Sequence, residues 1–508
     1  MWAETSQVPL EREANSRAIS VASDDGDKDV VDRGYLSIET AQTYLNVFQT
    51  VMTPHFPFVI IPPNVSMHHL RQDKPFLFLA ILASASYENM PLQRSLGGEV
   101  KKAVSARMIL NGEVSFDLLQ GLLVFLAWSH YHTKPHRYTQ YLQLAISVVI
   151  DLRLDRATQA KTWKTKLQFR ADEHVNQSTS DRPSRSNDER RAIIGCYYLS
   201  SSIAVLLQKH STFPYVSYIE DCSQALHDSN EYPHDRYIMH ILQLQLIAEK
   251  IDRLSADHGD ELSIPGSGAE LYVKSIKDDL STFQQRLPFN IYDSPFIALL
   301  FKSTSLHLYQ LALSVTKQQP LSSFQAAPIQ TWRDELSNAA VIAVESILGI
   351  YLSLPPASEL GFTNTEWVQL GFAMLIGLRI TAASPSPERK EAYLQTLALL
   401  RQRVGALSTP FVDHNGDRDV FVDFRKRILQ IQARLDGGQK NDTPSGDLHF
   451  EGPINGTQFI EPAFSLQEAD SRDWTDAPQD MLGFTENTGL PDDFLLTTSV
   501  EQVMNNWM

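Results

Sequence analysis

The sequence predicts an all-α protein, and three observations support this fold class. Successive segments carry apolar residues at the spacing of one helical face. No two alternating apolar–polar runs are joined by a two-residue turn, and β-branched clusters such as SVVIDL lie inside helical periodicity. With 508 residues, of which 43% are hydrophobic and 20% charged, the chain can bury a large core.

The helical pattern runs through most of the chain with short breaks. In the first part, helices are predicted at residues 38–53, 75–87, 92–110, 117–131, 138–151 and 189–208. In the second part they are predicted at residues 236–254, 269–287, 295–317, 332–352, 365–381, 388–404 and 420–435.

The segment SFDLLQGLLVFLAWSHYH, from Ser115 to His132, could be a membrane span, a metal-binding helix or a buried core helix. Ser115 and Asp117 suit a helix start. Five leucines then fall on one face: Leu118, Leu119, Leu122, Leu123 and Leu126. Apolar residues cover most of the other face too, which predicts burial on several sides. The apolar run is shorter than the ~20 residues of a membrane span, so no membrane association is expected.

Three histidines in HYHTKPH, namely His130, His132 and His136, resemble a metal site by composition. Histidines also suit the C-terminal end of a helix, which Pro135 would stop. His130 and His132 do not share a helical face, and no carboxylate at suitable spacing completes a site. We therefore expect no metal ligands.

Motifs of catalysis and cofactor binding are weak or absent. The chain contains no GxGxxG, GxxxxGK[ST], HExxH or GxSxG pattern. DHNGDRD, residues 413–419, departs from a calcium loop because Gly416 is its fourth residue and Phe424 occupies the twelfth position. DDGDKD, residues 24–29, is interpreted as a solvated charge run. No catalytic residue and no cofactor are predicted.

Charge is distributed unevenly along the chain. Residues 441–508 hold 13 acidic residues and one Arg, whereas the other 440 residues hold 47 acidic and 43 basic ones. The body is thus nearly balanced, and no basic domain is available for phosphate contacts. We expect no DNA-binding residues and poor affinity for nucleic acids.

Two cysteines, Cys196 and Cys222, are too few for a disulfide scaffold, a four-cysteine zinc site or an iron–sulfur cluster. They suit a reducing compartment. Cys196 lies in the apolar helix IIGCYYL, and Cys222 is expected in a loop. The N-terminus has no apolar signal core, so no signal peptide is expected.

Composition divides the chain into three parts. Residues 1–34 are polar and predicted to be disordered. Residues 35–436 form the helical domain, with a polar surface loop expected at 155–188. Residues 437–508, which begin with two glycines, are predicted to be a disordered acidic tail.

Six segments in order resemble one known family. They are YLNVFQTVMTPHFPFVIIP (44–62), KPFLFLAILASAS (74–86), GEVSFDLLQGLLVFLAWSHYH (112–132), YLQLAISVVIDLRLD (141–155), ERRAIIGCYYLSSSIA (189–204) and EYPHDRYIMHILQLQLIAEKI (231–251). They are similar to the helical regulatory ("middle homology") domain of fungal-specific transcription factors, the zinc-binuclear-cluster regulators. The resemblance covers residues 35–254 well and the helices up to 435 in general character.

Two departures from the family pattern stand out. The family's DNA-reading module carries six cysteines in a short basic segment, and this chain has no cysteine before Cys196. Arg153 stands where a DLGL-type glycine is common in the family, which concerns the local turn. The resemblance therefore implies a fungal transcriptional regulator or coregulator that acts without its own zinc-cluster DNA reader.

The resemblance also implies a setting for this regulator. We expect it in the nucleus, controlling a secondary-metabolite or nutrient-use gene cluster. Its expected partners are a transcriptional coactivator or a DNA-binding protein, a second copy of the chain and a small-molecule effector. Two alternatives stay open: an all-α enzyme acting on a hydrophobic small molecule, which needs an acidic metal motif on an apolar helix, and a helical interaction scaffold without a transcriptional role.

The acidic tail is the predicted functional site. Acidic residues there alternate with large apolar ones, a pattern typical of disordered activation segments. From Pro491 onward the apolar residues follow helical spacing, which suits docking in a coactivator groove. The candidate activation contacts are Trp474, Phe484, Phe494, Leu495, Leu496, Val500, Val503, Met504 and Trp507. Two alternatives for the tail stay open: it increases solubility through its acidic charge, or it forms a helix that docks on the body itself.

Overall fold

The computed structural model describes residues 28–131, 135–157, 185–207, 211–262, 269–317, 326–384, 386–412 and 418–437. The α-helices of these ranges are α1 (Ile38–Val47), α2 (Met67–Asp73), α3 (Pro75–Ala85), α4 (Met90–Val104), α5 (Phe116–Ala127), α6 (Pro135–Asp151), α8 (Asn187–Leu207), α9 (Ser217–Ser229), α10 (Asp235–Leu262), α11 (Ala269–Arg286), α12 (Pro295–Lys317), α13 (Ala326–Ser353), α14 (Asn364–Ala383), α15 (Pro387–Leu407) and α16 (Val420–Gly437). No β-strand occurs in these ranges, which confirms the predicted all-α fold.

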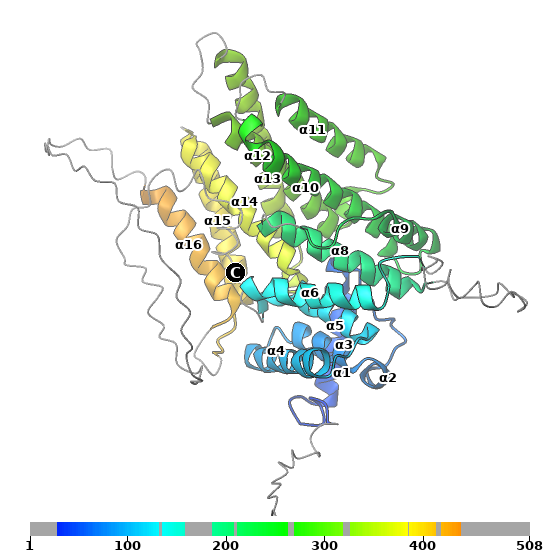
Figure 1. The fold of residues 1–508 in the computed structure, drawn as a ribbon. Coiled ribbons are helices and arrows are strands. Elements are labelled where there is room, and N and C mark those ends of the chain that lie inside the picture. The colour runs from blue at the N-terminus through cyan, green and yellow to red at the C-terminus, as the bar shows by residue number, and fades with distance from the viewer. Residues whose placement is uncertain are drawn as a thin grey trace, which may run out of the picture.

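The helices follow one another in space largely as they do in sequence. Figure 1 shows α1 to α5 gathered at one end of the molecule, with α6 and α8 between them and the later helices. In the later part, α10 packs on α11 and α12, α12 on α13 and α14, and α15 on α16. A single hydrophobic core extends through all of them, from Val30 to Leu435.

Helix α5 lies inside this core, as the sequence predicted. Its residues 118–127 are all buried, and apart from Gly121 each is no more than 1% exposed. Ser115 caps the helix by accepting the N–H of Leu118, and Asp117 in its first turn accepts the N–H groups of Phe76 and Leu77 at the start of α3. One carboxylate therefore joins the N-terminal ends of two buried helices, where its charge is favourable. Of the three interpretations of the segment from Ser115 to His132, the structure supports the buried core helix.

The residues that follow α5 connect the two halves of the sequence. The indole N–H of Trp128 donates to the carbonyl of Gly361 at 3.0 Å, and the Tyr131 hydroxyl donates to the carbonyl of Leu360 at 3.4 Å. The Tyr131 ring also meets the ring of Phe421 in α16 edge to face. The later helices thus complete the core begun by α1–α5.

Three local predictions need correction. Helix α2 was not predicted, and Pro135 begins α6 at its first position, where its missing N–H costs nothing. Cys222 lies in helix α9, not in a loop, and is buried. The buried stripe of α9 is Ile219, Cys222, Ser223 and Leu226. Its spacing is helical, but two of its four members are not strongly apolar, which hides the pattern in the sequence.

Helix α6 ends in a left-handed residue, Arg153, whose φ is 55°. The N–H of Leu154 donates to the carbonyl of Val149 at 2.8 Å, and the N–H of Arg153 to that of Ile150 at 2.9 Å. These two bonds form a Schellman cap, in which glycine is the usual left-handed residue. Of the predicted surface loop at 155–188, residues 158–184 lie outside the described ranges.

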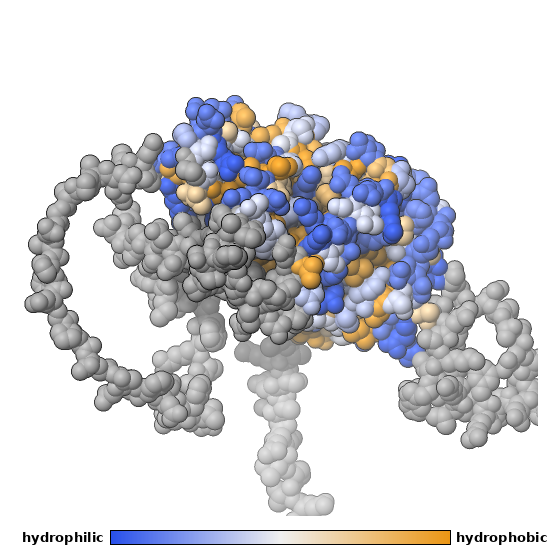
Figure 2. All heavy atoms as spheres, turned by 90° about the horizontal axis from the view of Figure 1, so that it is seen from above, coloured by the Kyte–Doolittle hydropathy of each residue, from blue (hydrophilic) through white to orange (hydrophobic). Residues whose placement is uncertain are grey.

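Among the described helices, two are long and apolar enough for a membrane span by length and composition. The windows are Pro295–Leu313 in α12, 67% buried, and Asp334–Ser353 in α13, 39% buried. Core helices of soluble proteins pass the same test. On the face shown in Figure 2, hydrophobic residues form scattered patches among hydrophilic ones. The described residues visible on that face form no continuous apolar surface.

Candidate functional site

A pocket lies among α8, α10, α12 and α14. Its lining residues are Ser202, Val205, Gln245, Ala248, Leu300, Ser303, Thr304, His307, Thr365, Gln369 and Phe372. The cavity has a volume of about 50 Å³, measured as the space open to the centre of a water-sized sphere, and the whole empty space, which includes open solvent, is about 540 Å³. Short stretches of four different helices therefore surround one partly enclosed space.

Part of the polar lining is satisfied within the protein. The Ser202 hydroxyl donates to Gln245 Oε1 at 3.2 Å, and Gln245 Nε2 donates to Ser201 Oγ at 2.9 Å. The hydroxyl of Thr304 donates to the carbonyl of Leu300 at 2.8 Å. These bonds hold the α8–α10 wall and part of α12 in one arrangement.

Two other polar side chains of the lining have atoms without a partner in the protein. Ser303 on α12 is 7% exposed and Gln369 on α14 is 6% exposed. Ser303 Oγ and Gln369 Oε1 are both enclosed and make no hydrogen bond. A buried polar atom without a partner costs roughly 1–3 kcal/mol, so these atoms favour the entry of a group that bonds them.

The lining carries no formal charge at neutral pH. Its described residues include no Asp, Glu, Lys or Arg, and burial lowers the pKa of His307 to about 4. His307 is half-buried as a residue, and its ring meets the Phe372 ring edge to face with ring centres 6.3 Å apart. His307 is therefore neutral above about pH 5, and the pocket can offer hydrogen bonds but no ion pair.

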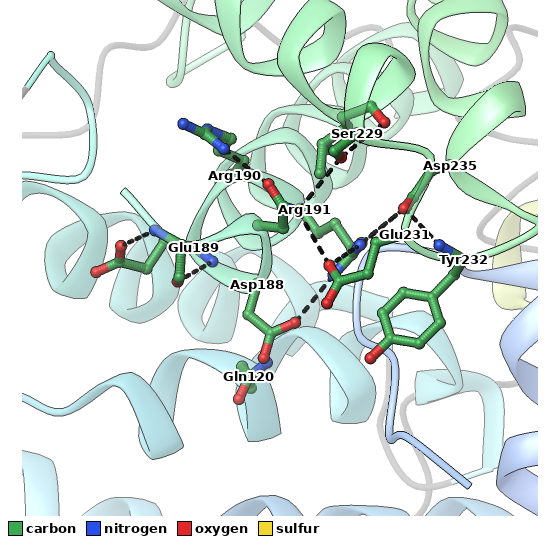
Figure 3. A network of polar contacts seen from close by, with 12 residues as sticks. Gln120, Asp188, Glu189, Arg190, Arg191, Ser229, Glu231, Tyr232 and Asp235 are labelled. Carbon is green, nitrogen blue, oxygen red and sulfur yellow. Dashed lines mark hydrogen bonds and ion pairs between the residues drawn. The ribbon is translucent and has the colours of Figure 1, made fainter. Parts of the chain in front are cut away.

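A second polar cluster surrounds Arg191, which is 1% exposed (Figure 3). Its guanidinium donates to both carboxylate oxygens of the fully buried Asp235 at 2.8 Å, to Glu231 at 2.7 Å and to Asp188 at 3.0 Å. The guanidinium also lies over the Tyr232 ring, 4.6 Å from its centre. The cluster joins α8 to the start of α10.

The electrostatics of this cluster favour the ion pairs. Burial acts to lower the pKa of Arg191, but hydrogen bonds to Asp235 and Glu231 outweigh it and raise that pKa. The hydrogen bond from Arg191 in turn lowers the pKa of Glu231. Four hydrogen bonds from the guanidinium go to carboxylates of the same cluster, so the role of Arg191 is to position α8 against α10.

The predicted site residues of the tail cannot be placed in this structure. The nine candidate contacts, from Trp474 to Trp507, lie outside the described residues. So do His132 and the side chain of His136, while His130 packs against Tyr131 with ring centres 4.0 Å apart. Within the described ranges no three His, Cys, Asp or Glu residues are grouped as metal ligands.

Both cysteines are buried core residues. Burial raises the pKa of the Cys196 thiol to about 12, and burial likewise raises that of Cys222. A thiol that stays protonated at neutral pH is a weak nucleophile and a weak metal ligand. The two thiols are therefore suited to packing.

Sequence reasoning missed the pocket. The signal available was a polar triplet inside the apolar run LLFKSTSLHL of α12, together with Gln369 inside WVQLGFAMLIGL of α14. Each is compatible with an ordinary helix position. Only the packing of α12 against α14 shows that both face one space.

The known proteins that this chain resembles in sequence are regulators of transcription. The family model of the WAR1 C-terminal domain matches residues 6–314. Transcription factor himD of Aspergillus japonicus is 37% identical over 413 residues, which are 80% of this chain and 67% of himD. Transcription factor opdL of Penicillium oxalicum is 27% identical over 67% of this chain and 59% of its own length.

A more distant relative carries the name of the family model. Transcriptional regulator WAR1 of Candida albicans is 21% identical over 55% of this chain and 29% of its own length. The chain thus matches about two thirds or less of the length of each of these relatives. No solved structure matches it. The chain belongs to the fungal transcription factors that share the WAR1 C-terminal domain.

Proposed function

We propose that this chain regulates transcription with two parts, a helical regulatory domain at residues 35–436 and an acidic activation segment at residues 437–508. The observation that carries this proposal is its 37% identity to a named fungal transcription factor over 80% of the chain. The tail sequence supports the division, because it holds most of the net charge and alternates acidic with large apolar residues.

In this proposal the chain works in the nucleus as a non-enzymatic coregulator. Its 508 residues contain no cluster of six cysteines, and its body is nearly neutral. In this proposal the DNA contact comes from outside these 508 residues, because phosphate binding needs a concentration of basic side chains, which the nearly neutral body lacks. A secondary-metabolite or nutrient-use gene cluster is the proposed target.

The proposed activation mechanism is capture of the tail by a coactivator. Repulsion among its acidic residues keeps Trp474, Phe484 and the last apolar residues accessible, and the acids speed encounter with a basic surface. On binding, Leu496, Val500 and Trp507 would share one face of a helix that enters a hydrophobic groove. Ordering of the segment would occur only on the partner.

The test is to fuse residues 441–508 to a foreign DNA-binding domain and to measure reporter output. We expect strong activation by the native tail. Replacing Phe494, Leu495, Leu496 and Trp507 together with alanine should abolish it, because the groove contacts are lost while the charge is kept. In the matched control, four polar residues of the tail are replaced with alanine: Thr497, Thr498, Asn505 and Asn506. This variant should leave reporter output unchanged.

Two results would contradict this mechanism. Output no higher than that of the bare DNA-binding domain removes the activation role. Output that survives the four apolar replacements shows that charge alone acts.

We further propose that the body forms a homodimer through a packed helical face, since no apolar heptad seam extends over three or four repeats. Light scattering over a hundredfold range of concentration tests this, and a monomer throughout contradicts it.

A further inference from the structure

We propose that the pocket among α8, α10, α12 and α14 binds an uncharged, largely apolar small molecule that carries a hydrogen-bonding group. This inference does not rest on the activation role of the tail. It assigns a ligand site to the regulatory domain and states the chemistry of its occupant.

The hydrogen-bonding group is required by the two unsatisfied atoms of the lining. Ser303 Oγ and Gln369 Oε1 come from facing helices, are more than nine-tenths buried as residues and bond nothing in the protein. The carbonyl oxygen of Gln369 can only accept, so it calls for a donor on the ligand. Ser303 can donate or accept and tolerates either partner.

The apolar character follows from the rest of the lining. Val205, Ala248, Leu300 and Phe372 come from α8, α10, α12 and α14 in turn, so apolar surface is present on every side. Small-molecule sites combine such a lining with a few convergent polar groups.

The absence of net charge follows from the electrostatics of the lining. A carboxylate ligand would find no cation among the described lining residues, and His307 is neutral at physiological pH. An ammonium ligand would find no free carboxylate either. The nearby Glu249 already accepts the hydroxyl of Tyr197 at 2.7 Å and that of Ser201. A buried ion without a partner is unfavourable, so either charge is selected against.

The size of the ligand is limited. The centre of a water-sized sphere can occupy about 50 Å³, several times the ~10–15 Å³ that one water needs. A single substituted ring suits this space better than an extended chain. Such a ligand would contact α8 and α10, which lie within the matched family region, and α14, which lies beyond it.

The experiment uses the full chain and three probes of similar shape: benzamide, benzoate and benzylammonium. Binding is measured by saturation-transfer NMR titration at pH 7. We expect benzamide to bind at least tenfold more tightly than either ion. Equal binding of an ion, or no saturation transfer from benzamide at 10 mM, would overturn the proposal.

Variants place the binding in this pocket. Ala248→Leu fills the pocket from α10 and should weaken benzamide binding at least tenfold. Ser303→Leu fills it from α12, should have the same effect, and replaces the first variant if that one folds poorly. Gln369→Leu should weaken benzamide binding but not that of toluene, which has no donor. Ser84→Ala is the matched control, because Ser84 is also buried with an unbonded hydroxyl but lies on α3, outside the pocket.

Circular dichroism of each variant confirms that the helices are retained. Benzamide affinity that is unchanged in both filling variants would show that the site lies elsewhere. An equal loss in Ser84→Ala would show an effect of general destabilisation.

Discussion

At the residue scale, two fully buried carboxylates are each paired with an arginine. Arg191 bonds Asp235, and the fully buried Glu359 accepts two hydrogen bonds from Arg403 at 2.8 Å each. Such pairs add little net stability relative to apolar residues, but removing one partner leaves an unpaired charge in the core. They therefore specify how the helices meet more than they strengthen the fold.

The cost of leaving a buried charge unpaired leads to a prediction for Arg191. Arg191→Met should lower the free energy of unfolding by roughly 3–5 kcal/mol, because Asp235 stays buried without its partner. The double variant Arg191→Met with Asp235→Leu should recover most of that loss. The matched control is Arg156→Met, which removes an exposed pair with Asp155 and should have no measurable effect. Urea denaturation measures all three, and a double variant no more stable than the single one contradicts the account.

A second prediction at this scale concerns Arg153, whose backbone is left-handed. Its side chain is exposed, and its carbonyl, which accepts a hydrogen bond from Arg185 at 2.6 Å, is kept in a glycine variant. Arg153→Gly should raise stability by about 0.5–1 kcal/mol, because relief of the left-handed strain exceeds the added entropy of the unfolded chain.

The matched control for Arg153 is Asn230→Gly. Asn230 also has a positive φ, 40°, at the end of α9. Asparagine tolerates this conformation, so only a small change is expected there. Thermal unfolding of both variants is the measurement, and a lower midpoint for Arg153→Gly would show that its side chain matters more than its backbone.

At the scale of the element, close approach of helices decides which residues are tolerated. Gly121 lies in the buried helix α5, where a side-chain carbon would overlap the ring of Phe76 and lie 3.2 Å from the backbone N of Leu77. Helices α3 and α5 can pack so closely only because this position has no side chain.

Gly121→Ala should therefore lower the free energy of unfolding by about 1–2 kcal/mol, although alanine is the better helix former by about 1 kcal/mol. Gly98→Ala in α4 is the matched control, because nothing lies within 4 Å of its added carbon. The free energy of unfolding of that variant should rise by about 0.5–1 kcal/mol. Chemical denaturation checks the opposite signs, and a stabilised Gly121→Ala would show that Phe76 moves away without cost.

At the scale of the whole molecule, the distribution of charge and cysteine has a direct consequence. Both cysteines are buried in helices of the core, and the 440 residues before the tail are nearly neutral. We expect the purified chain to carry no stoichiometric zinc and to show no sequence-selective duplex binding. Metal analysis and gel shifts at two salt concentrations are the measurements. About two zinc ions per chain, or a salt-resistant selective shift, would contradict this expectation.

Much of the fold could be predicted because most helices carry a wide apolar stripe. The predicted ranges 269–287 and 295–317 differ from α11 and α12 by at most one residue at either end. Helix α9 was not predicted because its buried face is narrow and includes a cysteine and a serine. The family resemblance, read from six segments, was confirmed by the relatives named above. The tail contacts stay a prediction.

The sequence by itself determined the helical fold class, the burial of α5, the family and the separation of a neutral body from an acidic tail, because periodicity, composition and local motifs are properties of neighbouring residues. Only the tertiary structure decided which distant residues meet. Trp128 bonds Gly361 across 233 positions, and Ser303 and Gln369 face one pocket from separate helices. Such contacts depend on how helices pack, and packing depends on shape complementarity between segments that no local pattern records.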